Sequence, residues 1–149
     1  MPNEYNKYVK ISERLIMLNK KSHKAYKLMY HLILVIKYRK KVFVNDEIIN
    51  KMKQKLINIS KDFDVQIVDQ GTDQDHIHIL FESTPMLDIT KYINILKGHS
   101  SRYIRKEFKQ FLQNKLWGDS FWSDSYYLVT TGNVSLSSLI KYIEQQEKK

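Results

Sequence analysis

The hydrophobic pattern of the first part of the chain predicts a strand followed by a helix. Residues 27–36 are apolar at nearly every position, which is typical of a short strand buried on both faces of a sheet. In residues 45–63 the hydrophobic side chains recur at helical spacing and form one stripe. Asn45 or Asp46 can cap this helix with a side-chain oxygen. A central strand and an amphipathic helix are therefore expected.

Two more strands are expected in the middle of the chain. Residues 65–68 and 75–82 each have the composition of a strand. Residues 71–73, which contain a glycine and an aspartate, are expected to form the turn between them. Pro85 follows and ends the unit. The pattern predicts a β-hairpin.

The remainder of the chain predicts a second long helix, a strand and a last helix. Hydrophobic positions recur at helical spacing over residues 88–112. Residues 117–124 are expected to form an irregular aromatic loop, and residues 126–131 a strand. After a turn at residues 132–133, the last helix is expected over residues 136–147.

This order, β-α-β-β-α-β-α, is that of a split βαβ unit with an added C-terminal helix. It predicts an α+β protein in which a single antiparallel sheet carries helices on one face, in a ferredoxin-like or RRM-like arrangement. Residues 1–22 are expected to form an N-terminal leader and residues 23–149 one domain. Because the helices cover one face, the chemistry is expected on the other.

Composition narrows the function without deciding it. The 149 residues include no cysteine, which excludes disulfides, thiolate metal sites and cysteine nucleophiles. No apolar run reaches about 18 residues and no secretory signal is recognised. A cytoplasmic location is therefore expected, without a membrane partner. Lys and Arg number 25 against 16 Asp and Glu, a net charge of +9. This balance favours nucleic acid as the partner, with a merely soluble basic protein as the alternative.

Two histidines occupy alternate positions of the strand predicted over residues 75–82. Because side chains alternate between the faces of a strand, His76 and His78 are expected together on the open face. Two imidazoles at this spacing can converge on one metal ion, although such a site needs a third ligand. Two polar residues on a solvated face would show the same pattern, so the pair alone does not decide.

The last predicted helix carries Tyr142 and Gln146 four residues apart, on one helix face. Apolar residues lie beside Tyr142, so packing in the core explains this tyrosine as readily as a catalytic role. Gln146 alone carries no signal.

The histidine pair, the Tyr142–Gln146 spacing and the basic single domain form a specific set when they occur together. On these residues the chain resembles the HUH single-tyrosine (Y1) transposases of small bacterial insertion sequences, and the related transposases associated with repeated (REP) palindromes. The matching stretches, in the family's order, are residues 22–23, 30–32, 37–41, 75–79, 97–102, 126–132 and 142–146.

The resemblance implies a site and a reaction. His76 and His78 look like the histidines of the HUH motif. Gln146 looks like the third ligand of a divalent metal ion, Mg²⁺ or Mn²⁺, and Tyr142 looks like the nucleophile. The implied activity is that of a metal-dependent bacterial DNA transposase, a single-strand endonuclease and strand transferase that works through a 5′-phosphotyrosine. Implied partners are single-stranded DNA with hairpins at the transposon ends and a second copy of the chain, in a homodimer that shares its active sites.

Basic and aromatic residues offer candidates for contact with DNA. Any one basic residue can instead belong to a solvated basic face, and any one aromatic residue can instead pack in the core. His31 is given a structural or DNA-contact role, and Asp73 and Asp75 are favoured as turn formers over partners of a metal-bound histidine. The basic candidates are Lys37, Arg39, Lys40, Lys41, Lys97, Arg102, Arg105 and Lys109, and the aromatic ones are Trp117, Phe121, Trp122, Tyr126 and Tyr127.

Three other functions fit parts of the pattern. A non-catalytic nucleic-acid-binding module of the same topology would favour aromatic residues over histidines on the open face. A metal-dependent phosphoesterase that uses water has no need of Tyr142. A decayed or domesticated transposase, in which the site is intact but the DNA of the element is lost, would keep the same residues.

Overall fold

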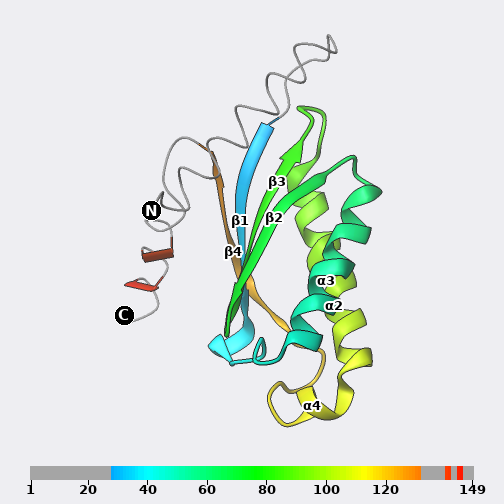
Figure 1. Cartoon of the computed structure of the whole chain (residues 1–149), viewed down its shortest axis with the longest axis vertical. Coiled ribbons are helices and arrows are strands. Elements are labelled where there is room, and N and C mark those ends of the chain that lie inside the picture. Colours follow the sequence, from blue (N-terminus) through cyan, green and yellow to red (C-terminus); the bar gives the residue numbers. More distant parts are fainter. Residues whose placement is uncertain (1–27, 132–139, 142–143, 146–149) are drawn as a thin grey trace.

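The computed structural model describes residues 28–131, 140–141 and 144–145, and these form two layers (Figure 1). One layer is a four-stranded antiparallel sheet with the strand order β2-β3-β1-β4, and the long helices α2 and α3 cover one of its faces. This confirms the predicted α+β class with a single antiparallel sheet. The elements are β1 (Leu28–Ile36), the 3₁₀ turn η1 (Lys37–Arg39), α2 (Asp46–Lys61), β2 (Gln66–Asp73), β3 (His76–Ser83), α3 (Ile89–Glu107), α4 (Lys109–Gln113) and β4 (Trp122–Thr130).

Helix α2 forms where the hydrophobic stripe predicts it. It begins after Asn45, whose side-chain oxygen accepts a hydrogen bond from the backbone N–H of Ile48 at 3.0 Å. Its buried apolar side chains recur every three or four residues, and they join the main core between helices and sheet. These side chains are Ile48, Met52, Leu56 and Ile59.

The second predicted helix is interrupted near its C-terminal end. Asp88 caps α3 by accepting a hydrogen bond from the backbone N–H three residues later, at 3.1 Å. Helix α3 ends at Glu107, because Phe108 leaves the helical conformation with φ −120° and ψ 39°. The prediction of a single helix over residues 88–112 is therefore wrong at this point. The break directs α4 so that Leu112 returns to the core, where it is buried.

The hairpin between β2 and β3 turns later than predicted. Strand β2 is eight residues long and includes the segment 71–73 that was predicted as the turn. Gln74 and Asp75 make the two-residue connection instead. Glycine marks either a turn or a close approach to a strand. Here it is the second, because Gly71 lies opposite His78.

Strand β4 also begins earlier than predicted. It starts at Trp122, inside the segment 117–124 that was predicted as an irregular loop. Trp122 pairs with Ile36 of β1. Its ring lies 4.7 Å from that of Phe121 and 6.1 Å from that of Phe43, measured between centroids. Packing of these aromatic rings in the core extends the regular part of the strand.

Several predictions concern parts of the chain outside the described residues. These parts include the leader at residues 1–22, the turn at residues 132–133, and both Tyr142 and Gln146. Of the last predicted helix, residues 140–141 and 144–145 are described and are helical. Within the described part of the chain, no helix has the length and apolar character needed to cross a membrane.

Candidate active site

Alternate residues of β1 and β3 line the face of the sheet that α2 and α3 leave open. Val35 lies opposite His76 and Ile33 opposite His78, so both histidines project to this face, as the strand alternation predicts. The face also carries a small hydrophobic cluster of its own, against which Ile140 of the last helix packs. The buried members of the cluster are Met29, Ile33, Val35 and Leu80.

His76 is held in place by two successive polar contacts. Its Nδ1 lies 2.8 Å from Oδ1 of Asp75. The other carboxylate oxygen of Asp75 accepts a hydrogen bond from Nε of Arg39 at 2.7 Å. Because an ionised carboxylate only accepts hydrogen bonds, Nδ1 of His76 is the donor and carries a proton. In the neutral ring, Nε2 is then the nitrogen whose lone pair can bind a metal ion.

The carboxyl group of Asp75 stays ionised in this arrangement. Partial burial raises its pKa, but the hydrogen bonds from Arg39 and His76 outweigh burial and lower the pKa below its usual value. Asp75 does stand in the hairpin turn, as favoured from the sequence. Its side chain also orients His76, which is the role that the sequence reasoning ranked second.

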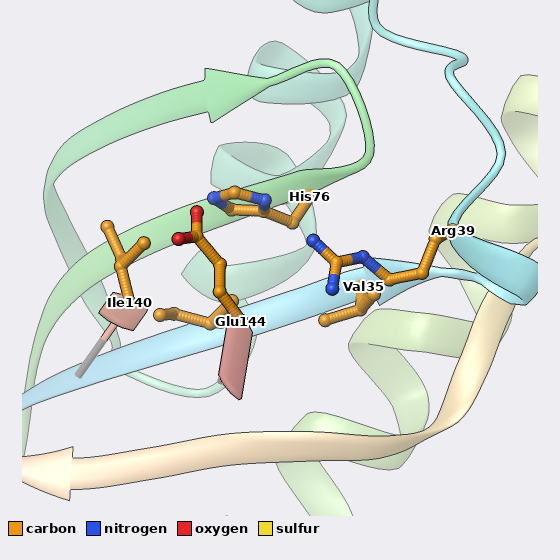
Figure 2. A pocket seen from close by; sticks show the side chains of 6 residues that line it. Val35, Arg39, His76, Ile140 and Glu144 are labelled. Atoms are coloured by element: carbon orange, nitrogen blue, oxygen red, sulfur yellow. The ribbon is translucent and has the colours of Figure 1, made fainter. Parts of the chain in front are cut away.

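A small pocket adjoins His76 and is partly enclosed by the last helix (Figure 2). The carboxylate of Glu144 points toward the His76 ring in this view. Ile140 and Glu144 are described residues of the last helix, so that helix lies beside His76 on the open face. Sequence reasoning missed Glu144, because a charged residue on a short helix has no distinguishing local signal. The lining residues are Ile33, Val35, Arg39, His76, Ile140 and Glu144.

The ring of His78 lies directly over Gly71 of the neighbouring strand. A Cβ atom added to Gly71 would stand 2.3 Å from Cε1 and 2.4 Å from Nε2 of His78, far inside van der Waals contact. The absence of a side chain at Gly71 is therefore what leaves room for this imidazole. The sequence did not reveal that role, because the glycine was interpreted as part of a turn.

A third histidine shares the open face. His31 is 2% exposed. Burial, and secondarily the charge of His78, lower the pKa of His31 to about 4. His31 is therefore neutral near pH 7, which is consistent with a structural role, one of the two roles expected for it.

The donors on the open face fit a divalent metal ion in their chemistry. His76 and His78 supply two neutral imidazoles on one strand face, and Asp75 holds the second nitrogen of one of them, as carboxylates do for metal-bound histidines. Among the described residues, no group of three or more His, Cys, Asp or Glu could hold an ion by itself. The predicted third ligand, Gln146, lies outside the described residues.

Four of the eight predicted DNA contacts are engaged within the protein. Asp124 accepts hydrogen bonds from Lys37 at 3.4 Å and, through its backbone carbonyl, from Lys97 at 3.2 Å. Arg105 donates to two backbone carbonyls of the loop before β4, and Arg39 pairs with Asp75. Contact of any of the eight with DNA stays a prediction. The other four, which are exposed, are Lys40, Lys41, Arg102 and Lys109.

The aromatic candidates include both buried and exposed side chains. Phe121 and Trp122 are buried in the core, whereas Trp117 is 86% exposed. Tyr38, which the sequence reasoning did not single out, is 77% exposed.

Comparison with known proteins gives a consistent result. Residues 24–146 match the family model described as "Transposase IS200 like". The chain is 35% identical over 125 residues to the ISDra2 transposase TnpA of Deinococcus radiodurans, a match that covers 84% of this chain and 88% of that protein. It is 28% identical over 127 residues to the transposase for insertion sequence element IS200 of Salmonella typhimurium, which covers 84% and 80%.

A solved structure extends the similarity to the fold. A crystal structure of a Deinococcus radiodurans protein described as a transposase superposes with a TM-score of 0.73 at 34% identity. The match covers 82% of this chain and 92% of that one.

Proposed function

Because this chain belongs to the IS200-like transposases, we propose that it cleaves and rejoins single-stranded DNA at the ends of an insertion sequence through a covalent bond to Tyr142. One observation supports this mechanism beyond family membership. Ile140 and Glu144, on either side of Tyr142 in the sequence, line the same pocket as His76 (Figure 2). The last helix and the histidine strand therefore meet on the open face of the sheet.

The proposed metal site consists of His76, His78 and Gln146. Mg²⁺ or Mn²⁺ would suit two imidazoles and an amide oxygen, with water and phosphate completing the shell. Such an ion polarises a phosphoryl oxygen and neutralises the charge that develops on it. The protein's own contribution is to present Nε2 of His76 to the pocket, with Asp75 fixing the opposite nitrogen.

The proposed nucleophile is the hydroxyl oxygen of Tyr142. It attacks the phosphorus of a DNA linkage and gives up its proton, while the bond from phosphorus to the 3′ oxygen breaks and that oxygen takes up a proton. The 5′ end is then held as phosphotyrosine and a 3′-hydroxyl is released. A 3′-hydroxyl from another strand loses its proton and attacks the same phosphorus. The bond from phosphorus to the tyrosine oxygen breaks, and that oxygen takes up a proton. The linkage energy is conserved, so strand exchange requires no ATP.

The nucleophile is tested by a denaturing-gel assay for a covalent protein–DNA adduct. The probe is labelled single-stranded hairpin DNA from the flanks of the protein's own gene, with and without Mn²⁺ or Mg²⁺. We expect a metal-dependent adduct that Tyr142→Phe abolishes while DNA binding remains, because that change removes only the hydroxyl. Cleavage by Tyr142→Phe would refute the assignment. Tight binding without an adduct under either metal would instead favour a binding module.

A further inference from the structure

Two of the most exposed aromatic side chains in the described part of the chain line one recess. Tyr38 is 77% exposed and Trp117 is 86% exposed. Tyr38 belongs to η1 and Trp117 follows α4, which lie at the same end of the sheet (Figure 1). Most large apolar side chains of the described residues are buried, so two exposed aromatic rings in one recess are unusual. The lining residues are Tyr38, Lys40, Asn114, Lys115, Leu116 and Trp117.

The backbone of η1 is strained where it carries Tyr38. Tyr38 and Arg39 have φ values of 58° and 55°, in the left-handed region that bulky residues seldom adopt. The hydrogen bond from Arg39 to Asp75 holds one of these residues inward, against the hairpin turn. The neighbouring Tyr38 remains exposed. Strain of this kind persists where the surrounding contacts hold it, and it points to a function.

Positive charge accompanies the rings. Lys40 and Lys115 line the recess itself. Nζ of Lys37 lies 5.6 Å from the centre of the Tyr38 ring. Flat aromatic faces next to lysines match the two parts of a nucleotide, since the base stacks on the rings and the phosphate is attracted to the ammonium groups.

We propose that this recess binds an unpaired nucleotide of single-stranded DNA, with its base stacked on Trp117 and Tyr38 and its phosphate near Lys40 and Lys115. The assignment rests on the proposed function, because it supposes that single-stranded DNA is the substrate. A series of neighbouring residues connects the recess to the candidate active site. Tyr38 adjoins Arg39, which is bound to the Asp75 that holds His76.

Tryptophan fluorescence tests the site directly. The chain has two tryptophans, and Trp122 is buried with its indole N–H donating to Ser100 at 3.0 Å. In a Trp122→Phe background, Trp117 is the only reporter. The probe is a single-stranded oligothymidylate, added to the Tyr142→Phe form so that no cleavage occurs. We expect DNA to quench the Trp117 emission. With a fluorescently labelled oligothymidylate followed by anisotropy, a readout that does not need Trp117, we expect Trp117→Ala or Tyr38→Ala to weaken binding about 5- to 150-fold.

Matched variants separate stacking from general surface effects. Trp117→Phe and Tyr38→Phe keep a ring and are expected to retain most of the affinity. Met86→Ala removes an exposed apolar side chain, 91% accessible, that lies outside the recess, and it should have no effect. Lys40→Ala is expected to weaken binding mainly at low salt, because its contribution is electrostatic.

Three results would overturn the site. The first is emission from Trp117 that DNA does not change, and the second is unaltered affinity in both alanine variants. The third is a shift from dimer to monomer in Trp117→Ala with DNA affinity unchanged, which would make the recess a contact between copies of the chain. Failure of the proposed chemistry is distinct, because it appears as a missing adduct in protein with an intact Tyr142.

Discussion

At the scale of single residues, Asp75 has the clearest effect on the candidate site. One carboxylate oxygen holds Nδ1 of His76 at 2.8 Å and the other holds Arg39 at 2.7 Å. The ring is thereby restricted to one orientation and one tautomer when neutral. Arg39, which was predicted as a DNA contact, donates its Nε hydrogen bond to Asp75 within the protein.

Substitution of Asp75 is expected to affect metal binding more than folding. In Asp75→Asn the acceptor to His76 can remain, but the negative charge that supports the imidazole and pairs with Arg39 is lost. We expect Mn²⁺ affinity to fall about 10- to 100-fold, measured by electron paramagnetic resonance on DNA-free protein. The matched control is Asp124→Asn, which removes an exposed carboxylate paired with Lys37. Equal losses in both variants would show that Asp75 has no special role.

At the scale of elements, the β2–β3 hairpin determines where the second histidine sits. The register places Gly71 opposite His78, and the His78 ring occupies the space that a side chain at Gly71 would fill. A strand glycine usually weakens a sheet. In this hairpin the glycine instead leaves the space in which the His78 imidazole takes a defined position.

Adding one methyl group to β2 tests this arrangement. In Gly71→Ala the new Cβ would overlap the His78 ring, which must turn away. Because a ring can move more easily than backbone, we expect the melting temperature to change little while Mn²⁺ affinity drops about tenfold. Thr72→Ala is the control, since Thr72 lies next in the strand and is paired with Ile77. Unchanged Mn²⁺ affinity in Gly71→Ala would contradict the assignment.

At the scale of the whole molecule, α2 and α3 cover one face of the sheet, and described residues of the last helix lie against part of the other. Ile140 packs on the apolar cluster of the open face and Glu144 lines the pocket at His76. In the homodimer that the family resemblance implies, the same helix from a second copy would take this place. Each active site would then combine His76 of one subunit with Tyr142 of the other.

A mixed dimer tests whether sites are shared. One subunit carries Tyr142→Phe and the other carries His76→Ala. If sites are shared, one composite site has both lesions and the other has none, so about half of the adduct-forming activity should survive. Complete loss of the adduct in the isolated mixed dimer would mean that each helix serves the histidines of its own chain. Each homodimer of a single variant provides the inactive baseline.

Local periodicity accounts for what could be predicted. Alternation along residues 75–82 placed His76 and His78 on one face, and helical spacing located α2 and most of α3. These patterns depend on the backbone geometry of a single element, so neighbouring residues suffice to reveal them. The break at Phe108 was missed because the helical pattern continues through it, and the position of the hairpin turn was missed because Gly71 resembles a turn residue.

The sequence by itself determined the order of elements, the fold class, the family and the two histidines of the open face. Only the tertiary structure decided that Arg39 reaches Asp75, that Gly71 makes room for His78, and which aromatic rings stay exposed. Arg39 and Asp75 are 36 positions apart. Contacts of this kind depend on strand register and on which ends of the sheet come together. Register follows from how the strands pair and where the hairpin turns, and here the turn lies later than the sequence predicted.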